Sequence, residues 1–559
     1  MTSDSHSSSP ISRRRRRLVV IAVGAIAVLA VLAGALTLGT HNDDTVAQPE
    51  PSPTSSPSAS FERPAEWDPH RPAIHFTPEQ NWMNDPQKPF LLDGVWHYYY
   101  LYNADHPDGN GTAWYHATST DLIHWEDQGV AIEKYTNGLG DIWTGTAVVD
   151  HDGTAGFGDG AVVALVTQQA DGVQRQSLFV STDGGYEFTP YEGNPVMDNP
   201  GVADWRDPRV FWDDDAGHWV MALAEHDRIG FYTSPNLRDW TYTSDFTTTG
   251  LGVLECPDLF PMSVDGDPDD IRWVLVAGAN GTEEGMTTGT AYWTGEWDGE
   301  RFVADGTGHQ WLDHGSDYYA AVTWDDPRLP ENERLASRYG IGWMNNWAYA
   351  GRFPTQEWQG GSDSIIRSIR LASDGGRVTL RSTPAPELQA LEGDALAVDD
   401  ALLDAGGAVD VTMPTADAYR LRLDVAAADP ATGEVRVRIE MGDGRFATVG
   451  YDFDSGRAFV TRDADAVADE MPDAYREVRT AAVPARDGRV RLDVVVDVAS
   501  IEVFVGDGEA ALTMAVFGAS GERGARIEAV RGPIAVTDAS VTPLRVAPVE
   551  RVPSERQSG

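Results

Sequence analysis

The sequence predicts an all-β protein in which an array of repeated sheets, as in a propeller, is followed by a β-sandwich. Residues 66–375 contain many short β-prone runs separated by Gly, Asp, Asn and Pro, without a long helical apolar period. A phrase of Ser-Thr-Asp or Ser-Pro-Asn, then Leu, then Trp, recurs at 119–125 and 234–240. Such recurrence at large spacing is typical of repeated four-stranded sheets. Residues 386–545 contain no Trp and alternate apolar with charged residues, which predicts the sandwich.

Four runs of the first region illustrate the expected strands, and four more illustrate those of the sandwich. In the first region they are 95–103, 161–169, 218–226 and 272–280. In the second they are 419–427, 435–442, 489–497 and 500–508. Each is rich in Val, Ile, Leu or aromatic residues and is bounded by turn-forming residues, as strands are.

Residues 1–39 are expected to act as a secretion signal or a membrane anchor. Five consecutive arginines, Arg13 to Arg17, precede an apolar run over 18–38. That run approaches the ~20 residues needed to span a bilayer, which favours an uncleaved anchor. A weak cleavage point after Ala47 leaves the cleaved signal open. Either way the arginines stay in the cytoplasm and the rest of the chain is extracytoplasmic.

Two further segments are expected to lack a packed core. Residues 40–65 are rich in Pro and Ser and read as a disordered linker. Residues 546–559 read as a disordered polar tail.

The composition of the chain indicates which kinds of ligand to expect. The formal net charge of −45 argues against nucleic acid, whose affinity for proteins comes mainly from Lys and Arg on phosphates. The 18 Trp and 18 Tyr suit the apolar C–H faces of sugars, although many must be core. The single cysteine, Cys256, excludes an intrachain disulfide and a cysteine-based zinc site. We expect it to be a buried, inert thiol.

Three short strings each place a carboxylate in a fixed local setting. They are NWMNDP (81–86), WRDPR (205–209) and ECPD (255–258), which supply Asp85, Asp207 and Glu255. Two carboxylates flanking a glycosidic bond are the minimum for retaining sugar hydrolysis, and a third beside an Arg suits sugar hydroxyls. Taken alone, Asn-Asp-Pro is usually a turn and Arg-Asp a surface ion pair. The order of all three in one Trp- and Tyr-rich stretch favours a catalytic site without a metal or an organic cofactor.

These strings and several longer blocks resemble glycoside hydrolase family 32, the β-fructofuranosidases, levanases and inulinases. The blocks are HFTPEQNWMNDPQKPF (75–90), WYHATSTDLIHWEDQGVAI (114–132), WTGTAVVD (143–150), WRDPRVFW (205–212), ECPDLFPM (255–262), HGSDYYAAVTW (314–324), IGWMNNW (341–347) and SIEVFVGDGEAALTMAVF (500–517). The resemblance covers about 70–545. It implies a catalytic five-bladed β-propeller over 66–375 and a C-terminal β-sandwich over 386–545, which we expect to buttress the propeller.

The resemblance also implies a role for each carboxylate. Asp85 would be the nucleophile, Glu255 the acid/base and Asp207 a stabiliser of the transition state. A carboxylate behind the reacting carbon can trap its oxocarbenium character covalently before water releases the sugar. Pro86 restricts Asp85 to extended backbone. Arg206 is expected to lower the pKa of Asp207 and keep it ionised.

The matching motifs also imply a fructose pocket. Its expected members are Trp82, Asn84, Trp143, Thr144, Arg206, Asp317 and Trp347. Any one of the Trp residues could instead be plain core.

The chain departs from the family pattern at three places. Gln87-Lys88 follow the Asp-Pro where the family usually has Asn-Gly, Leu101 replaces a Gln, and 104–111 lacks a usual Trp. This pattern is more similar to the actinobacterial levan-acting branch. We therefore predict a retaining β-fructosidase that prefers levan to inulin and sucrose.

Three alternatives stay open at the level of sequence. A levan fructotransferase or a levanbiose-releasing enzyme would use the same three carboxylates, and geometry would decide whether water or a sugar hydroxyl attacks the intermediate. A surface fructan-binding protein would keep the pocket without turnover. A related propeller glycosidase would act on arabinan or xylan, which the Asn-Asp-Pro block and the sandwich disfavour.

Overall fold

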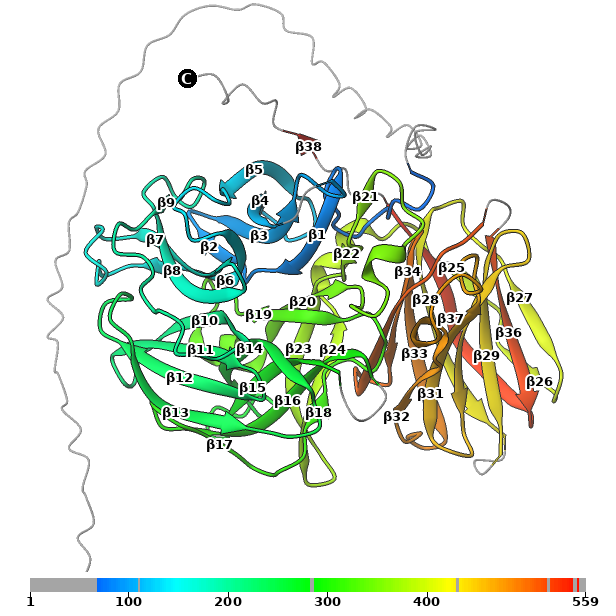
Figure 1. The fold of residues 1–559 in the computed structure, drawn as a ribbon. Helices are drawn as coiled ribbons and strands as arrows, with labels where there is room; N and C mark the ends of the chain where they lie inside the picture. Colours follow the sequence, from blue (N-terminus) through cyan, green and yellow to red (C-terminus); the bar gives the residue numbers. More distant parts are fainter. Residues whose placement is uncertain are drawn as a thin grey trace, which may run out of the picture. The chain divides into compact units, whose positions relative to one another are not determined.

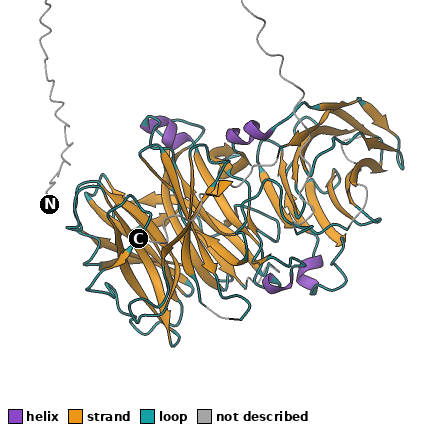
Figure 2. Ribbon diagram, turned by 90° about the horizontal axis from the view of Figure 1, so that it is seen from above, coloured by secondary structure: helices purple, strands orange, loops and turns teal. Residues whose placement is uncertain are grey.

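The computed structural model describes residues 68–108, 111–281, 286–428, 432–519, 523–545 and 550–551 (Figure 1). This part of the chain is all-β, with only short helical segments such as α1 (Glu331–Ala336) and α2 (Asp473–Arg476) between the strands (Figure 2). The expected signal or anchor, the linker and nearly all of the expected tail lie outside the described residues. Within the described residues, no helix combines the length and apolarity that crossing a membrane requires.

Five largely antiparallel sheets follow one another along the first region, and we number them one to five in chain order. The first contains β1 (Asn81–Pro86), β2 (Phe90–Leu92), β3 (Val95–Asn103), β4 (Ala113–Ser119) and β5 (Glu126–Ile132), extended at its edges by β21 (Trp358–Gln359) and β38 (Glu550–Arg551). The second contains β6 (Asp141–Asp150), β7 (Ala161–Ala170), β8 (Val173–Ser181) and β9 (Thr189–Pro190). The third contains β10 (Trp205–Asp213), β11 (His218–Glu225), β12 (Arg228–Ser234) and β13 (Thr241–Thr247).

The fourth and fifth sheets complete this region. The fourth contains β14 (Val253–Ser263), β15 (Ile271–Asn280), β16 (Thr288–Trp297), β17 (Phe302–Ala304) and β18 (Gln310–Trp311). The fifth contains β19 (Tyr319–Trp324), β20 (Arg338–Met344), β22 (Ser362–Asp363), β23 (Arg367–Asp374) and β24 (Arg377–Pro384). The β-prone runs at 95–103, 161–169, 218–226 and 272–280 are confirmed as β3, β7, β11 and β15.

Each of the five sheets packs its side chains against the next. Leu165 of the second sheet packs with Met221 of the third, and Val276 of the fourth packs with Ile369 of the fifth. Similar clusters join the third sheet to the fourth and the first to the second. The fifth sheet in turn packs on the first, where Trp324 meets Trp96. Because central strands such as β7 are covered on both faces, they are apolar almost throughout rather than alternating.

The C-terminal region is a β-sandwich of two sheets. One contains β25 (Leu396–Val398), β26 (Ala401–Leu403), β28 (Ala418–Ala427), β33 (Arg489–Val496), β34 (Ser500–Val505), β35 (Ala510–Ala515) and β37 (Ile534–Leu544). The other contains β27 (Ala408–Val411), β29 (Glu434–Met441), β30 (Phe446–Asp452), β31 (Arg457–Ala464), β32 (Arg479–Ala482) and β36 (Arg523–Arg531). Alternate residues such as Leu421 and Val437 point into one shared core, as aligned sandwiches require.

Buried ion pairs join the sandwich to the first region. Arg367 Nη1 lies 2.7 Å from Asp313 and its Nη2 lies 2.5 Å from Glu502 of β34. His75 bridges Glu502 and Asp497, at 2.8 Å from each, and all these side chains are fully buried. Because a buried charge without its partner is very costly, this network favours the buttressing role expected for the sandwich.

Candidate active site

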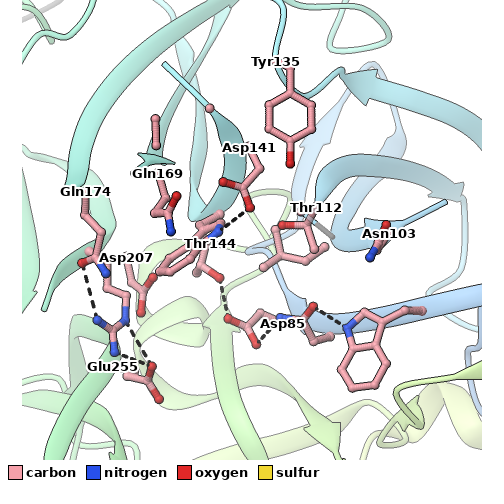
Figure 3. Close-up of a pocket in the computed structure, with 18 of the residues that line it drawn as sticks. Asp85, Asn103, Thr112, Tyr135, Asp141, Thr144, Gln169, Gln174, Asp207 and Glu255 are labelled. Atoms are coloured by element: carbon pink, nitrogen blue, oxygen red, sulfur yellow. Dashed lines mark hydrogen bonds and ion pairs between the residues drawn. The ribbon is translucent and has the colours of Figure 1, made fainter. Parts of the chain in front are cut away.

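A cavity of about 870 Å³ opens near the beginnings of the first strands of sheets one to four (Figure 3). Nine of the ten residues proposed from sequence line it. They are Trp82, Asn84, Asp85, Trp143, Thr144, Arg206, Asp207, Glu255 and Trp347. Residues that are up to 265 positions apart in sequence therefore meet in one pocket. Strands β1, β6, β10 and β14 carry eight of them, and Trp347 follows β20.

A backbone irregularity occurs in the first strand of every one of the five sheets, at the level of the pocket. The registers shift between Asn84 and Pro86, Ile142 and Gly145, Arg206 and Arg209, Glu255 and Asp258, and Tyr319 and Val322. Asp207 and Cys256 take positive φ values of 66° and 45° there. Bulges re-aim side chains beside active sites, and such a φ costs about 1–3 kcal/mol for residues other than Gly. The strands therefore keep pairing while their site residues turn toward the cavity.

Asp85 is held by two side-chain donors. Thr144 Oγ1 donates to its Oδ2 at 2.5 Å, and Asn84 Nδ2 donates to its Oδ1 at 3.1 Å. Burial and then the negative charge of Glu255 raise the pKa of Asp85, while the donated hydrogen bonds oppose that rise. The arrangement gives a half-buried carboxylate whose anionic form depends on Thr144 and Asn84.

Gln87 fixes the backbone around that carboxylate. Its Nε2 donates to the carbonyl oxygen of Asp85 at 2.9 Å, and its Oε1 accepts from the N–H of Gly145 at 2.8 Å. The side chain is fully buried. One of the chain's departures from the family pattern thus links β1 to the bulge of β6 that carries Thr144.

Asp207 accepts hydrogen bonds from Cys256, and the low pKa expected for Asp207 is not found. The N–H of Cys256 donates to Asp207 Oδ2 at 3.0 Å. Burial raises the pKa of Asp207 to about 7; Arg206 opposes this, while Glu255 and Asp85 add to it. The sequence suggested that Arg206 would pair with Asp207 and give it a low pKa; Arg206 does lower that pKa, but by less than burial and the other two carboxylates raise it. The guanidinium is instead engaged by other carboxylates.

Arg206 binds Glu255 and Asp204. Its Nη2 and Nε lie 2.8 and 3.1 Å from Glu255 Oε1, and its Nη1 lies 2.6 Å from Asp204 Oδ1. The other oxygen of Glu255 accepts hydrogen bonds from the Tyr319 hydroxyl and from Asn280 Nδ2, the latter at 3.3 Å. Glu255 is therefore fixed in position through both oxygens.

Cys256 lies between two of the carboxylates. Its Sγ is 3.7 Å from Asp85 Oδ2 and 3.6 Å from Asp207 Oδ2. Burial, followed by the charges of Asp207, Asp85 and Glu255, raises the pKa of the thiol well above its usual value. The thiol is buried and stays neutral, in agreement with the inert role expected from sequence.

Aromatic rings form one wall of the pocket. Trp82 stacks on Trp347 with a centroid separation of 6.4 Å, and Trp82 Nε1 donates to Asn84 Oδ1 at 3.0 Å. His106 lies 5.2 Å from the Trp82 ring. Trp347 is 42% exposed, so it presents its ring to the cavity rather than to a core. Flat exposed rings of this kind suit the apolar face of a sugar.

The placement of Asp317 in the pocket was wrong. Its side chain is fully buried and does not line the cavity. Asp317 accepts from Arg462 Nη1 at 2.5 Å, from the Tyr349 hydroxyl at 2.6 Å and from the N–H of Ala515 at 2.8 Å. It belongs to the packing between the first region and the sandwich.

Several pocket residues were missed from sequence. They are Asn103, His106, Tyr135, Asp141, Gln169, Gln174 and Asp204. They come from strand ends and loops without a local motif, and only Asp141 and Asp204, two positions before Trp143 and Arg206, had a signal in their spacing. In Figure 3 Asn103 and Tyr135 lie on the opposite side of Thr144 from Asp207 and Glu255. Within the described residues, no group of three or more His, Cys, Asp or Glu side chains is arranged to hold a metal ion.

An all-β fold with three carboxylates and an aromatic wall in one pocket is typical of glycoside hydrolases. The family model of glycosyl hydrolases family 32 matches the chain over residues 75–384 for the N-terminal domain and 387–546 for the C-terminal domain. The chain belongs to glycosyl hydrolases family 32.

Two named relatives and one solved structure are similar to most of the chain. The chain is 46% identical over 451 residues to a levanbiose-producing levanase of Bacillus subtilis, covering 80% of this chain and 86% of that protein. It is 47% identical over 383 residues to a levanbiose-producing levanase of Geobacillus stearothermophilus, covering 68% of this chain and 95% of that protein. Among solved structures, an exo-inulinase from Aspergillus awamori aligns with a TM-score of 0.76 at 28% identity, covering 86% of this chain and 99% of that chain.

Proposed function

We propose that this protein hydrolyses the β-D-fructofuranosyl linkages of levan with retention of configuration. Asp85 is the nucleophile, Glu255 the acid/base and Asp207 the stabiliser of the transition state. The observation that carries the proposal is the convergence of these three carboxylates in one pocket, with Arg206 bound to Glu255 and no cation bound to Asp85 among the described residues. A nucleophile needs free access to the reacting carbon, whereas the acid/base needs only to reach the leaving oxygen.

The charges of the pocket favour a cationic transition state. The mutual repulsion of Asp85, Asp207 and Glu255 contributes to the raised pKa of both aspartates. An oxocarbenium-like sugar brings positive charge into that group and relieves the repulsion, which stabilises the transition state more than the neutral substrate. Asp207 also accepts hydrogen bonds from sugar hydroxyls. Water then attacks the ester on Asp85 with Glu255 as base.

Levanbiose is the product that the pocket favours. Glu255 protonates the leaving oxygen, so the side away from it, toward Asn103 and Tyr135, holds the part of the chain that is transferred (Figure 3). Leu101 is a departure from the family pattern, His106 lies in the segment that lacks the usual Trp, and both line the pocket. Loss of the usual Trp there leaves room for a second fructosyl unit. Two relatives near 46% identity are named for levanbiose production.

We also propose a fold for the first region and a location for the protein. Five sheets that pack in sequence, with the fifth on the first, support a five-bladed propeller. The arginine block and the apolar run at the N-terminus support an extracytoplasmic location, and a relative from Aspergillus niger is named as an extracellular exo-inulinase. Polymeric levan would then be met outside the cell.

One experiment tests the function. The purified protein is incubated separately with levan, inulin and sucrose, and the products are separated by chromatography beside an Asp85→Asn control. Levanbiose from levan is expected. Free fructose would support simple exo-hydrolysis, and a cyclic difructose would support fructosyl transfer. Arabinan and xylan are tested in the same way. If none of the five substrates gives a product, the proposed enzymatic activity is contradicted and a fructan-binding protein is favoured.

A further inference from the structure

A second cavity lies at the opposite ends of the strands that build the active site. Its volume is about 760 Å³. It is lined by residues that follow the site residues along the same strands, such as Val148 of β6, Arg209 of β10 and Phe260 of β14. Lys88, two residues after β1, lines it as well. We call it the rear cavity, and nothing in the proposed chemistry uses it.

Lys88 is an unusual side chain in this protein. The 559-residue chain contains only two lysines, Lys88 and Lys134, among its 42 basic residues. Lys134 forms an ion pair with Asp105 at 2.7 Å. Among the described residues, no acceptor lies within hydrogen-bonding or ion-pair distance of the Lys88 ammonium, and Lys88 lines the rear cavity. A partly buried cation without a counter-ion is costly.

The two carboxylates whose charges act on Lys88, Asp258 and Asp325, are already bound to arginines or to other donors. Asp258 accepts from Arg209 Nε at 2.7 Å through one oxygen, and from the N–H and hydroxyl of Thr323 through the other. Asp325 pairs with Arg334 at 2.5 Å and with Arg338 at 3.9 Å. Four cationic side chains, Lys88, Arg209, Arg334 and Arg338, therefore share two carboxylates.

The electrostatics of Lys88 agree with this geometry. Burial, and then the positive charges of Arg209 and Arg338, lower the pKa of Lys88 to about 7, against the opposing charges of Asp325 and Asp258. A bound anion would reverse the sign of the local field and raise that pKa.

We propose that the rear cavity binds a small oxyanion, a carboxylate or a phosphate, between Lys88, Arg209 and Arg338. Guanidinium groups bind both kinds of oxyanion through paired N–H donors, and the ammonium adds a point charge. The Arg338 guanidinium is also held over the Phe260 ring at 4.1 Å, which fixes its orientation.

The outer part of the rear cavity limits the negative charge that a ligand can carry. Asp214, Asp215 and Glu331 are exposed acidic residues that line it, and Asp213 lines it as well. These carboxylates would repel a polyanion such as nucleic acid. A ligand with a single anionic group is repelled less and can reach the cationic end.

Because the chain contains only two lysines, the effect of an anion on each ammonium group can be measured separately. Reductive methylation with ¹³C-formaldehyde gives NMR signals for Lys88, Lys134 and the amino terminus, and a Lys88→Met variant assigns the first. Titration in phosphate, acetate or chloride at equal ionic strength then reports the pKa of Lys88. We expect phosphate or acetate to raise it by about one unit relative to chloride while Lys134 is unmoved. A response to phosphate alone or to acetate alone would identify the class of oxyanion.

Thermal unfolding supplies a second measurement on unmodified protein. Phosphate or acetate is expected to raise Tm by about 2 °C over chloride in the wild type and in Lys134→Met, but not in Lys88→Met. Equal responses in the wild type and Lys88→Met would place the anion elsewhere. A Lys88 pKa that is the same in all three salts would overturn the proposal.

Discussion

The hydrogen bond from Thr144 to Asp85 offers a quantitative test of the site. Thr144 Oγ1 lies 2.5 Å from Asp85 Oδ2; Thr144 is buried and Asp85 is half-buried. A hydrogen bond to a charged group is worth about 1.5–3 kcal/mol, and one pKa unit corresponds to about 1.4 kcal/mol. Thr144→Val keeps the shape and removes the donor. We therefore expect the pKa of Asp85 to rise by a further ~1–2 units.

The assay is the pH dependence of kcat/KM on levan. Activity needs ionised Asp85, so the acid limb of the profile should move to higher pH by that amount, with the rate largely recovered above it. Thr146→Val is the matched control, because Thr146 lies on the same strand but donates to the carbonyl oxygen of Pro208 at 2.8 Å. Its acid limb should not move. A uniform loss of rate in Thr144→Val, with an unmoved limb, would refute the reasoning.

Three other predictions follow from the same contacts. Arg206→Met should raise the pKa of Asp207 above about 7, because the guanidinium is the largest charge opposing burial there; the loss of kcat/KM should be greater at pH 6 than at pH 8, and equal losses would contradict this. For His75, burial lowers the pKa but hydrogen bonds and charges from Asp497 and Glu502 overcome it and raise the pKa to about 9. The resulting stability of about 3 kcal/mol is fully present below pH 6.5 and is lost as pH rises through 9, so chemical denaturation should show a smaller difference between wild type and His75→Gln at pH 9.5 than at pH 6. His106→Trp should fill the space beside Trp82 and shift the products from levanbiose toward fructose, and an unchanged product ratio would argue against the second fructosyl position.

The strands were the most predictable part of the molecule. The run at 161–169 appears as β7 and that at 489–497 as β33, because short apolar runs bounded by turn residues have few other stable solutions. The sandwich strands show the alternating burial that their sequence predicts, as in β29. The ordered motifs also identified nine of the residues that line the pocket.

The pairing of charged groups was less predictable, because it depends on long-range geometry. Arg206 is adjacent to Asp207 in sequence, yet the bulge in β10 directs its guanidinium to Glu255, 49 positions away. Asp317 lies in a motif-rich stretch, but its partner Arg462 is 145 positions away on the sandwich. Likewise, the sequence shows Lys88 only as a departure from a family motif, whereas the structure places it in one cavity with Arg209 and Arg338.

Trapping the covalent intermediate tests the central claim most directly. Wild-type protein is mixed with levan, quenched in acid within the first turnovers, digested and examined by mass spectrometry. We expect an ester on Asp85 that carries two fructosyl units, absent in Asp85→Asn, together with a β-configured product. Products released with inverted configuration, or an ester on another carboxylate, would contradict the assignment of Asp85 as the nucleophile of a retaining levan hydrolase.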